Sequence, residues 1–188
     1  MDARKGNIYE ILNGNKQFLI PVYQRFYSWD IEQCRRLWND IVIMQKEEKQ
    51  GHFVGSIVNI AEQAMPTGVQ KYMIIDGQQR MTTLSLLLLA LRDYGLKHPE
   101  DQTINARRID NMLLKNEYES GEERFKLLLT ESDKDVLIAL VEQNRFKVTI
   151  TQGFVLTIIF STNKSNPKNF RLQKYMSRSG NYKLLILH

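Results

Sequence analysis

The sequence predicts a mixed α/β fold, an α+β arrangement in which a small mixed sheet is covered by helices and is followed by a helical segment and an irregular basic tail. Three observations predict it. Residues 72–75 form a short, partly β-branched apolar run that is typical of a strand. Met81 to about Tyr94 is rich in Leu and Ala and apolar nearly all round, as a buried helix is. Clear helical periodicity is lost in the last quarter of the chain.

The composition limits the classes of protein to which the chain can belong. At 188 residues, we expect one domain or one and a half. The single cysteine, Cys34, excludes a disulfide framework and a cysteine metal site. The sequence shows no N-terminal signal pattern, and its longest apolar run is too short to span a membrane. We therefore expect a cytoplasmic protein without a membrane partner.

The excess of basic over acidic residues is confined to the last quarter of the chain. Residues 143–188 hold eight of the 26 basic residues and no acidic one, which leaves 18 basic against 21 acidic residues before them. Such a tail can be an arm that contacts nucleic acid. It can also be a cut-off domain whose acidic partners are missing, or a tail translated out of its original frame. The weak periodicity of the tail, in which residues 147–160 are β-like or unstructured, favours the last two interpretations.

The first 60 residues are expected to form a short helix, an extended segment, a long helix and a strand. Residues 7–12 place three apolar side chains on one face of a short helix. Residues 17–22 are extended, and Pro21 indicates either an edge strand or the end of a strand. Residues 53–60 form another strand, in which Gly55 indicates a bulge or a close approach by another group.

Asp30 to about Glu47 is expected to form the first long helix. Asp30 can cap its N-terminus, with Gln33 as the capping-box partner. The apolar stripe that faces the core consists of Cys34, Trp38, Ile41 and Met44. Cys34 is therefore interpreted as an ordinary buried thiol.

Three further elements are expected after the long apolar helix, which Gly95 is predicted to end. A polar linker leads to a second-layer helix at residues 104–115. Residues 124–129 predict a short strand. Thr130 or Ser132 is expected to cap a last helix.

The central strand and the apolar helix are joined by a polar turn, Asp76–Arg80, with the sequence DGQQR. Backbone N–H groups at a helix start lack intrahelical partners and carry partial positive charge, so they suit an anion. Gly77 permits angles closed to other residues, and Arg80 adds a planar fork of donors that matches phosphate or carboxylate. Asp76 can cap the helix, orient Arg80 or hold a metal ion that bridges phosphates. The other interpretation is a capped turn whose Arg80 pairs with a surface carboxylate.

A second unusual stretch, PVYQRFYSW at residues 21–29, interleaves four aromatic residues with Gln24 and Arg25. Aromatic faces beside an arginine can stack a nucleotide base and bind a phosphate. Alternatively, the aromatics pin a loop into the core while Arg25 lies on the surface. For the aromatics we prefer core packing, and for Gln24 and Arg25 the spacing decides nothing.

Several of these motifs occur together in an order that matches a known family. They are Pro21–Arg25 (PVYQR), Trp29, Phe53–Ile57 (FVGSI), Ile75–Arg80 (IDGQQR), Thr82 and Thr83. Over about residues 5–145 the chain resembles the N-terminal domain of GmrSD-type, modification-dependent restriction endonucleases. That domain is similar to the ParB/sulfiredoxin fold, so the resemblance implies a ParB-like core.

The resemblance implies that the DGQQR turn binds and hydrolyses a nucleoside triphosphate (NTP), with Mg²⁺ as a further cofactor. It implies catalytic roles for Asp76, Arg80 and Arg25, in which Asp76 would position water, Mg²⁺ or Arg80. The nucleotide-binding residues would be Tyr23, Gln24, Gly77, Gln78, Gln79 and Thr82. The resemblance does not specify which nucleotide is bound.

The resemblance also implies partners. Family members sense modified foreign DNA, often phage DNA, and couple this to a nuclease, commonly an HNH module in a separate C-terminal part or subunit. The three histidines of this chain, His52, His98 and His188, lack ligand-like spacing, so we predict no nuclease site here. DNA and a nuclease supplied elsewhere are the expected partners.

The expected organisation is a ParB-like nucleotide-binding core at 5–95, a helical extension of the same domain at 96–145, and a basic tail at 146–188. Family proteins usually continue with a large helical region, which this tail does not resemble. The chain is therefore interpreted as a truncated or frame-altered member of the family.

A rival function is a non-catalytic, ParB-like DNA-binding or adaptor module in which a nucleotide acts only as a switch. Its phosphate contacts would come from the basic side chains of the tail, Lys164, Lys168, Arg171, Lys174 and Arg178. An inactive fragment is the third interpretation.

Overall fold

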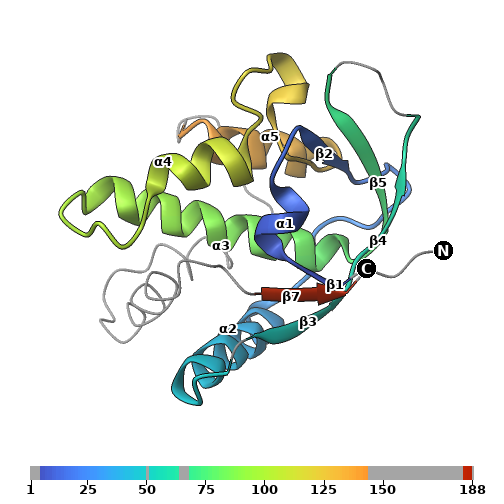
Figure 1. Ribbon diagram of the computed structural model, residues 1–188. Helices are drawn as coiled ribbons and strands as arrows, with labels where there is room; N and C mark the ends of the chain where they lie inside the picture. The colour runs from blue at the N-terminus through green and yellow to red at the C-terminus, as the bar shows by residue number, and fades with distance from the viewer. Residues whose placement is uncertain (1–4, 50, 64–67, 144–183, 188) are drawn as a thin grey trace.

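The computed structural model describes residues 5–49, 51–63, 68–143 and 184–187 and confirms the mixed α/β class (Figure 1). Two sheets and several helices contribute to an apolar core. Its buried side chains come from strands and helices alike, among them Phe18, Ile41, Ile74, Leu84 and Val136. The predicted segment 147–160 and the basic residues at 164–178 lie outside the described residues.

The larger sheet is mixed and has four strands in the order β4-β5-β2-β6. Its strands are β2 (Lys16–Leu19), β4 (Val58–Ala61), β5 (Gln70–Asp76) and β6 (Leu127–Leu128). β2 runs parallel to both β5 and β6, whereas β4 is antiparallel to β5. Because parallel neighbours end at the same edge of a sheet, the loop after β2 and the turn after β5 leave the sheet side by side.

A second sheet has three strands in the order β1-β7-β3. They are β1 (Lys5–Asn7), β3 (His52–Ser56) and β7 (Leu184–Leu187). β7 is antiparallel to β1 and parallel to β3. Within the tail that was expected to be irregular, residues 184–187 therefore form a strand.

Five α-helices lie in the described ranges. They are α1 (Ile8–Leu12), α2 (Ile31–Lys46), α3 (Gln78–Lys97), α4 (Ala106–Ile109) and α5 (Glu131–Val141). A π-helical turn, η1 (Asp110–Leu114), follows α4, and a 3₁₀ turn, η2 (Gly121–Arg124), precedes β6. Figure 1 shows α3 crossing the middle of the molecule with α4 beside it. None of the described helices combines the length and hydropathy that a membrane span requires.

The predicted beginnings of α1 and α2 are confirmed. α2 opens with the expected capping box, in which the Asp30 carboxylate accepts from the backbone N–H of Gln33 while the Gln33 side chain accepts from that of Asp30. α1 opens with a corresponding box between Asn7 and Glu10. Both boxes satisfy N–H groups that would otherwise be unpaired at a helix start.

α3 is longer than predicted at both ends. It begins at Gln78 rather than Met81, so most of the predicted turn forms its first turn. It also passes Gly95, which was predicted to end it. A Cβ at Gly95 would lie 2.9 Å from Ile104 Cγ2 and 3.1 Å from Ala106 Cβ. The glycine therefore permits close packing of the helix against the neighbouring segment rather than helix termination.

Two strand predictions also need correction. The strand predicted at 53–60 is broken at Ile57, and its halves, β3 and β4, join different sheets. Pro21 follows β2, which is an interior strand, so the strand-end interpretation is confirmed and the edge-strand interpretation is wrong. The segment predicted as a strand at 124–129 is a strand only at β6, and Thr130 precedes α5 without a side-chain capping bond.

Candidate functional site

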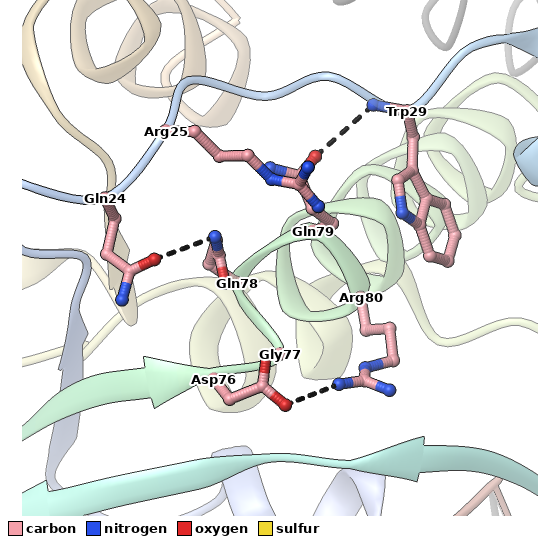
Figure 2. Close-up of a pocket in the computed structure, with 8 residues that line it drawn as sticks. All are labelled: Gln24, Arg25, Trp29, Asp76, Gly77, Gln78, Gln79 and Arg80. Atoms are coloured by element: carbon pink, nitrogen blue, oxygen red, sulfur yellow. Dashed lines mark hydrogen bonds and ion pairs between the residues drawn. The ribbon is translucent and has the colours of Figure 1, made fainter.

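A cavity of about 580 Å³ lies where the loop after β2 meets the turn after β5 (Figure 2). It is lined by Gln24, Arg25, Trp29, Asp76, Gly77, Gln78, Gln79 and Arg80. The parallel pairing of β2 with β5 explains why two stretches some fifty residues apart share one cavity. Its volume falls within the range of about 300–1,000 Å³ that is usual for ligand pockets.

The floor of the cavity is the start of α3. Gly77 is the N-cap residue, with φ 94° and ψ 11°, and no side chain caps the helix. This left-handed conformation favours glycine. The predicted capping of the helix by Asp76 is therefore wrong. The first N–H groups of a helix have no intrahelical acceptor, so an uncapped helix start that lines a cavity can bind an anion.

Arg80 and Asp76 form an ion pair one helical turn apart. Arg80 Nη2 lies 3.2 Å from Asp76 Oδ2, and the side chains are 26% and 66% exposed. Figure 2 shows the Arg80 side chain extending from α3 toward Asp76. Three roles were left open for Asp76. The one that the ion pair supports is the orientation of the Arg80 side chain.

Gln79 holds the aromatic loop in place. Its Oε1 accepts hydrogen bonds from the backbone N–H groups of Ser28 at 2.8 Å and Trp29 at 3.3 Å. Its Nε2 donates to the backbone carbonyl of Phe26 at 3.0 Å. Gln79 is 5% exposed, so its amide is committed to the loop even though the residue lines the cavity.

Gln78 and Gln24 link the turn to the same loop. Gln78 Nε2 donates to Gln24 Oε1 at 2.9 Å, and Gln24 Nε2 donates to the backbone carbonyl of Ile75 at 2.9 Å. The two glutamines therefore fix the distance between the loop and the end of β5. Their positions confirm that the two polar motifs meet in space.

Arg25 and Trp29 complete the wall that the loop contributes. Arg25 is exposed and makes no hydrogen bond or ion pair with the described residues. Trp29 is half-buried and packs against the core while lining the cavity. It was not among the predicted site residues, although its place in the aromatic motif was a signal for it.

The other aromatics of the loop divide between the core and the surface. Tyr27 is buried, and its hydroxyl lies 2.9 Å from Thr83 Oγ1, as predicted for core packing. Tyr23 and Phe26 are 70% and 52% exposed, so that prediction is wrong for them.

Tyr23 and Thr82 are the predicted site residues that do not line the cavity. The Tyr23 hydroxyl lies 3.8 Å from Met73 Sδ of β5. Thr82 is buried, and its hydroxyl donates to the Gln78 carbonyl at 2.8 Å. All the other predicted site residues line the cavity.

A metal ion at this site would have one protein carboxylate available, that of Asp76. The described ranges contain no group of three or more His, Cys, Asp or Glu side chains able to hold a metal. Mg²⁺ is commonly bound by one or two carboxylates together with substrate phosphates and water. Asp76 therefore fits Mg²⁺ that arrives with a nucleotide. His52 and His98 lie elsewhere, beside Asp40 and Glu100.

Comparison with family models matches residues 8–183 to the family described as "GmrSD restriction endonuclease, N-terminal domain". The match extends beyond residue 145, where the resemblance based on the motifs ended. A search among curated proteins finds no match.

Proposed function

The chain belongs to the family of GmrSD restriction endonuclease N-terminal domains, and we propose on this premise that it is the NTP-binding and NTP-hydrolysing domain of a restriction system that acts against phage. In this proposal nucleotide turnover is coupled to the sensing of DNA, including DNA that carries chemical modifications. The nuclease is supplied by another domain or subunit. We also propose that the core of the domain is ParB-like.

The observation that carries the proposal is an uncapped helix start that opens into a cavity between two arginines. The start of α3 offers backbone N–H groups, and Arg80 and Arg25 reach the cavity from α3 and from the loop. An anion of several negative charges, such as a triphosphate, matches this set of donors. Neutral ligands would leave the charge of Arg25 unbalanced.

The proposed chemistry is phosphoryl transfer to water. The water oxygen bonds to the terminal phosphorus as the bond from phosphorus to the bridging oxygen breaks, which releases a nucleoside diphosphate, inorganic phosphate and a proton. Negative charge moves onto the bridging oxygen, and Arg25 and Arg80 would offset it. Asp76 would hold Mg²⁺, which when bound neutralises charge on the phosphate oxygens.

The roles of the glutamines follow from their hydrogen bonds. Gln79 holds the loop that carries Arg25, and the pair Gln78–Gln24 holds that loop against the turn. We assign all three to positioning of the site. Catalysis by positioned charges requires such support, because a displaced arginine loses most of its effect.

The test is a thermal-shift titration of the purified chain with ATP, GTP, CTP and UTP, each with Mg²⁺, followed by a turnover assay. A ligand that binds only the folded form raises the midpoint of unfolding. We expect one or more NTPs to raise it, and Arg25→Ala and Arg80→Ala to lose both the shift and the turnover. Arg107→Ala, a change at an exposed arginine on α4, is the control and should behave as wild type. No shift with any NTP would refute nucleotide binding.

A second function is favoured by the basic composition of residues 143–188. A non-catalytic DNA-binding module would use this charge, and its affinity for DNA would fall steeply as salt rises. Replacement of Lys164, Lys168, Arg171, Lys174 and Arg178 by alanine would then abolish DNA binding while nucleotide binding persisted, because β7 keeps its place between β1 and β3. DNA binding that survives these substitutions would refute this role of the tail.

A further inference from the structure

We propose that Gly55 is a positioning residue that forms a seat for the guanidinium of Arg80, and that the corner between β3 and β4 supports the site from behind Arg80 and the turn. The corner is defined as residues 55–57. None of its residues lines the cavity directly. The functional part of this inference rests on the proposed nucleotide binding, whereas the seat itself can be tested without a ligand.

The first observation is the space above Gly55. A Cβ built on Gly55 would lie 3.1 Å from Arg80 Cδ and 3.2 Å from Arg80 Cζ, and it would clash directly with Arg80 Nη1. The guanidinium therefore lies against the backbone of β3 at the one residue without a side chain. Gly55 was predicted to mark a bulge or a close approach, and the group that approaches it is Arg80.

The second observation is that the same corner touches the turn at Gly77. A Cβ on Gly77 would lie 3.0 Å from the Ser56 carbonyl oxygen and 3.1 Å from Ile57 Cα. Ile57 is completely buried, and β4 pairs with β5 from the next residue onward, with Val58 opposite Asp76. The corner is therefore anchored in the core and pressed against the start of α3.

These contacts hold the Arg80 side chain from two sides. Asp76 binds its Nη2, and the backbone at Gly55 supports its Nη1, Cζ and Cδ. An arginine side chain has many rotamers when it is free, and binding a ligand normally requires that freedom to be lost. We infer that the seat fixes Arg80 before a nucleotide arrives.

The ligand-free test compares two glycine substitutions. Gly55 and Gly68 have φ 109° and φ 117°, both of which strain an alanine. Nothing lies within 4 Å of a Cβ at Gly68, so Gly68→Ala reproduces the backbone strain without the contact. The probe is phenylglyoxal, which labels accessible arginines, with the labelling rate at Arg80 followed by peptide mass spectrometry and normalised to exposed Arg107.

We expect Gly55→Ala to raise the labelling rate of Arg80 at least threefold and Gly68→Ala to leave it unchanged. Equal rates in Gly55→Ala and wild type would overturn the seat. Should Gly55→Ala be recovered poorly, the double variant with Arg80→Ala decides the same point. In a background that lacks the Arg80 side chain, Gly55→Ala should lower the unfolding midpoint only as much as Gly68→Ala does. If Gly55→Ala lowers the midpoint as much without Arg80 as with it, the proposal is overturned.

The functional arm uses inorganic tripolyphosphate and ATP as probes in isothermal titration calorimetry. Gly55→Ala should weaken binding at least tenfold, whereas Gly68→Ala should leave it unchanged. If wild type binds and Gly55→Ala binds equally well, the functional part of the inference fails. If wild type binds neither probe, the proposed function fails, and the labelling comparison still decides whether Gly55 seats Arg80.

Discussion

Gln79 Oε1 accepts a hydrogen bond from the backbone N–H of Ser28 at 2.8 Å, and this bond ties the first turn of α3 to the loop after β2. The same amide group binds Trp29 N and the Phe26 carbonyl. A motif that looks as if it serves only a ligand therefore also holds its neighbour in the fold. The two roles can be separated by substitution.

Gln79→Leu should release the loop and expose Trp29. The substitution removes one acceptor and one donor that together satisfy three backbone groups of residues 26–29, and we expect about 1–3 kcal/mol of lost stability. In a Trp38→Phe background, the emission of Trp29 should shift to longer wavelength. Gln79→Glu is the comparison variant, because it keeps the acceptor oxygens for Ser28 and Trp29, although it loses the donor to Phe26 and adds a negative charge. An unchanged emission spectrum for Gln79→Leu would show that the Gln79 amide does not hold the loop in place.

Lys126 should make the stability of the protein depend on pH in the alkaline range. The side chain is 3% exposed, and burial together with the charge of Lys16 lowers the pKa of Lys126 from 10.5 to about 8. Between these values the unfolded chain binds more protons than the folded one, so the free energy of unfolding rises with pH. This contribution of Lys126 to the free energy of unfolding is fully present above pH 10.5 and is lost as the pH falls through about 8.

The measurement is urea unfolding of wild type and Lys126→Met at several values between pH 7.5 and 9.5. We expect the midpoint to rise with pH in wild type and to rise less in Lys126→Met. The Gly14 carbonyl, which Lys126 Nζ contacts, keeps its hydrogen bond from the Lys16 backbone N–H at 2.9 Å in the variant. Parallel curves for the two proteins would show that Lys126 does not carry the dependence.

Local patterns were enough to predict most of the elements near the site. The run at residues 72–75 and the DGQQR turn predicted a strand, a polar corner and a helix, because periodicity and glycine placement report local backbone geometry. The meeting of Gln24 and Arg25 with that turn depends on the parallel pairing of β2 with β5. Strand pairing is a long-range property that spacing along the chain does not specify, and only the resemblance suggested it.

Residues that serve tertiary contacts were misread as local signals. Gly95 looked like a helix stop, but its missing side chain makes room for Ile104. Residues 53–60 were predicted as one strand, whereas the chain passes from one sheet to the other at buried Ile57. Gln79 looked like a ligand contact because nothing in the sequence shows that its amide is already paired with the loop.

Gly95→Ala should lower the stability of the protein although alanine favours helices. In an exposed helix the change would stabilise by up to about 1 kcal/mol. Here the new Cβ would lie 2.9 Å from Ile104 Cγ2 and 3.1 Å from Ala106 Cβ, and overpacking of this kind costs about 1–3 kcal/mol. Thermal unfolding of Gly95→Ala beside the double variant Gly95→Ala/Ile104→Ala tests the cause. A stabilised single variant would contradict the close packing.

Arg92 should be the most damaging single substitution in α3. Its guanidinium is fully buried, and each of its three nitrogens donates. Nε and Nη2 reach Asp93 at 3.0 and 2.8 Å, Nη1 reaches Asp110 at 2.8 Å, and the carbonyls of Val141 and Leu140 accept at 2.7 and 2.9 Å. The arginine therefore joins α3 to η1 and to the end of α5, where unpaired carbonyls carry partial negative charge.

Arg92→Leu removes the buried cation that joins these groups, and we expect a loss of about 3 kcal/mol in urea unfolding. Asp110 keeps an ion pair with Lys115 Nζ at 2.7 Å, so Arg92→Leu/Asp110→Asn should recover only a small part of the loss. Arg107→Leu, at an exposed position on the neighbouring α4, should change stability by no more than about 0.5 kcal/mol. Because the buried contacts of Arg92 involve residues remote from the cavity lining, nucleotide affinity of the folded fraction should stay unchanged. A loss of affinity without a loss of stability would contradict this purely architectural role.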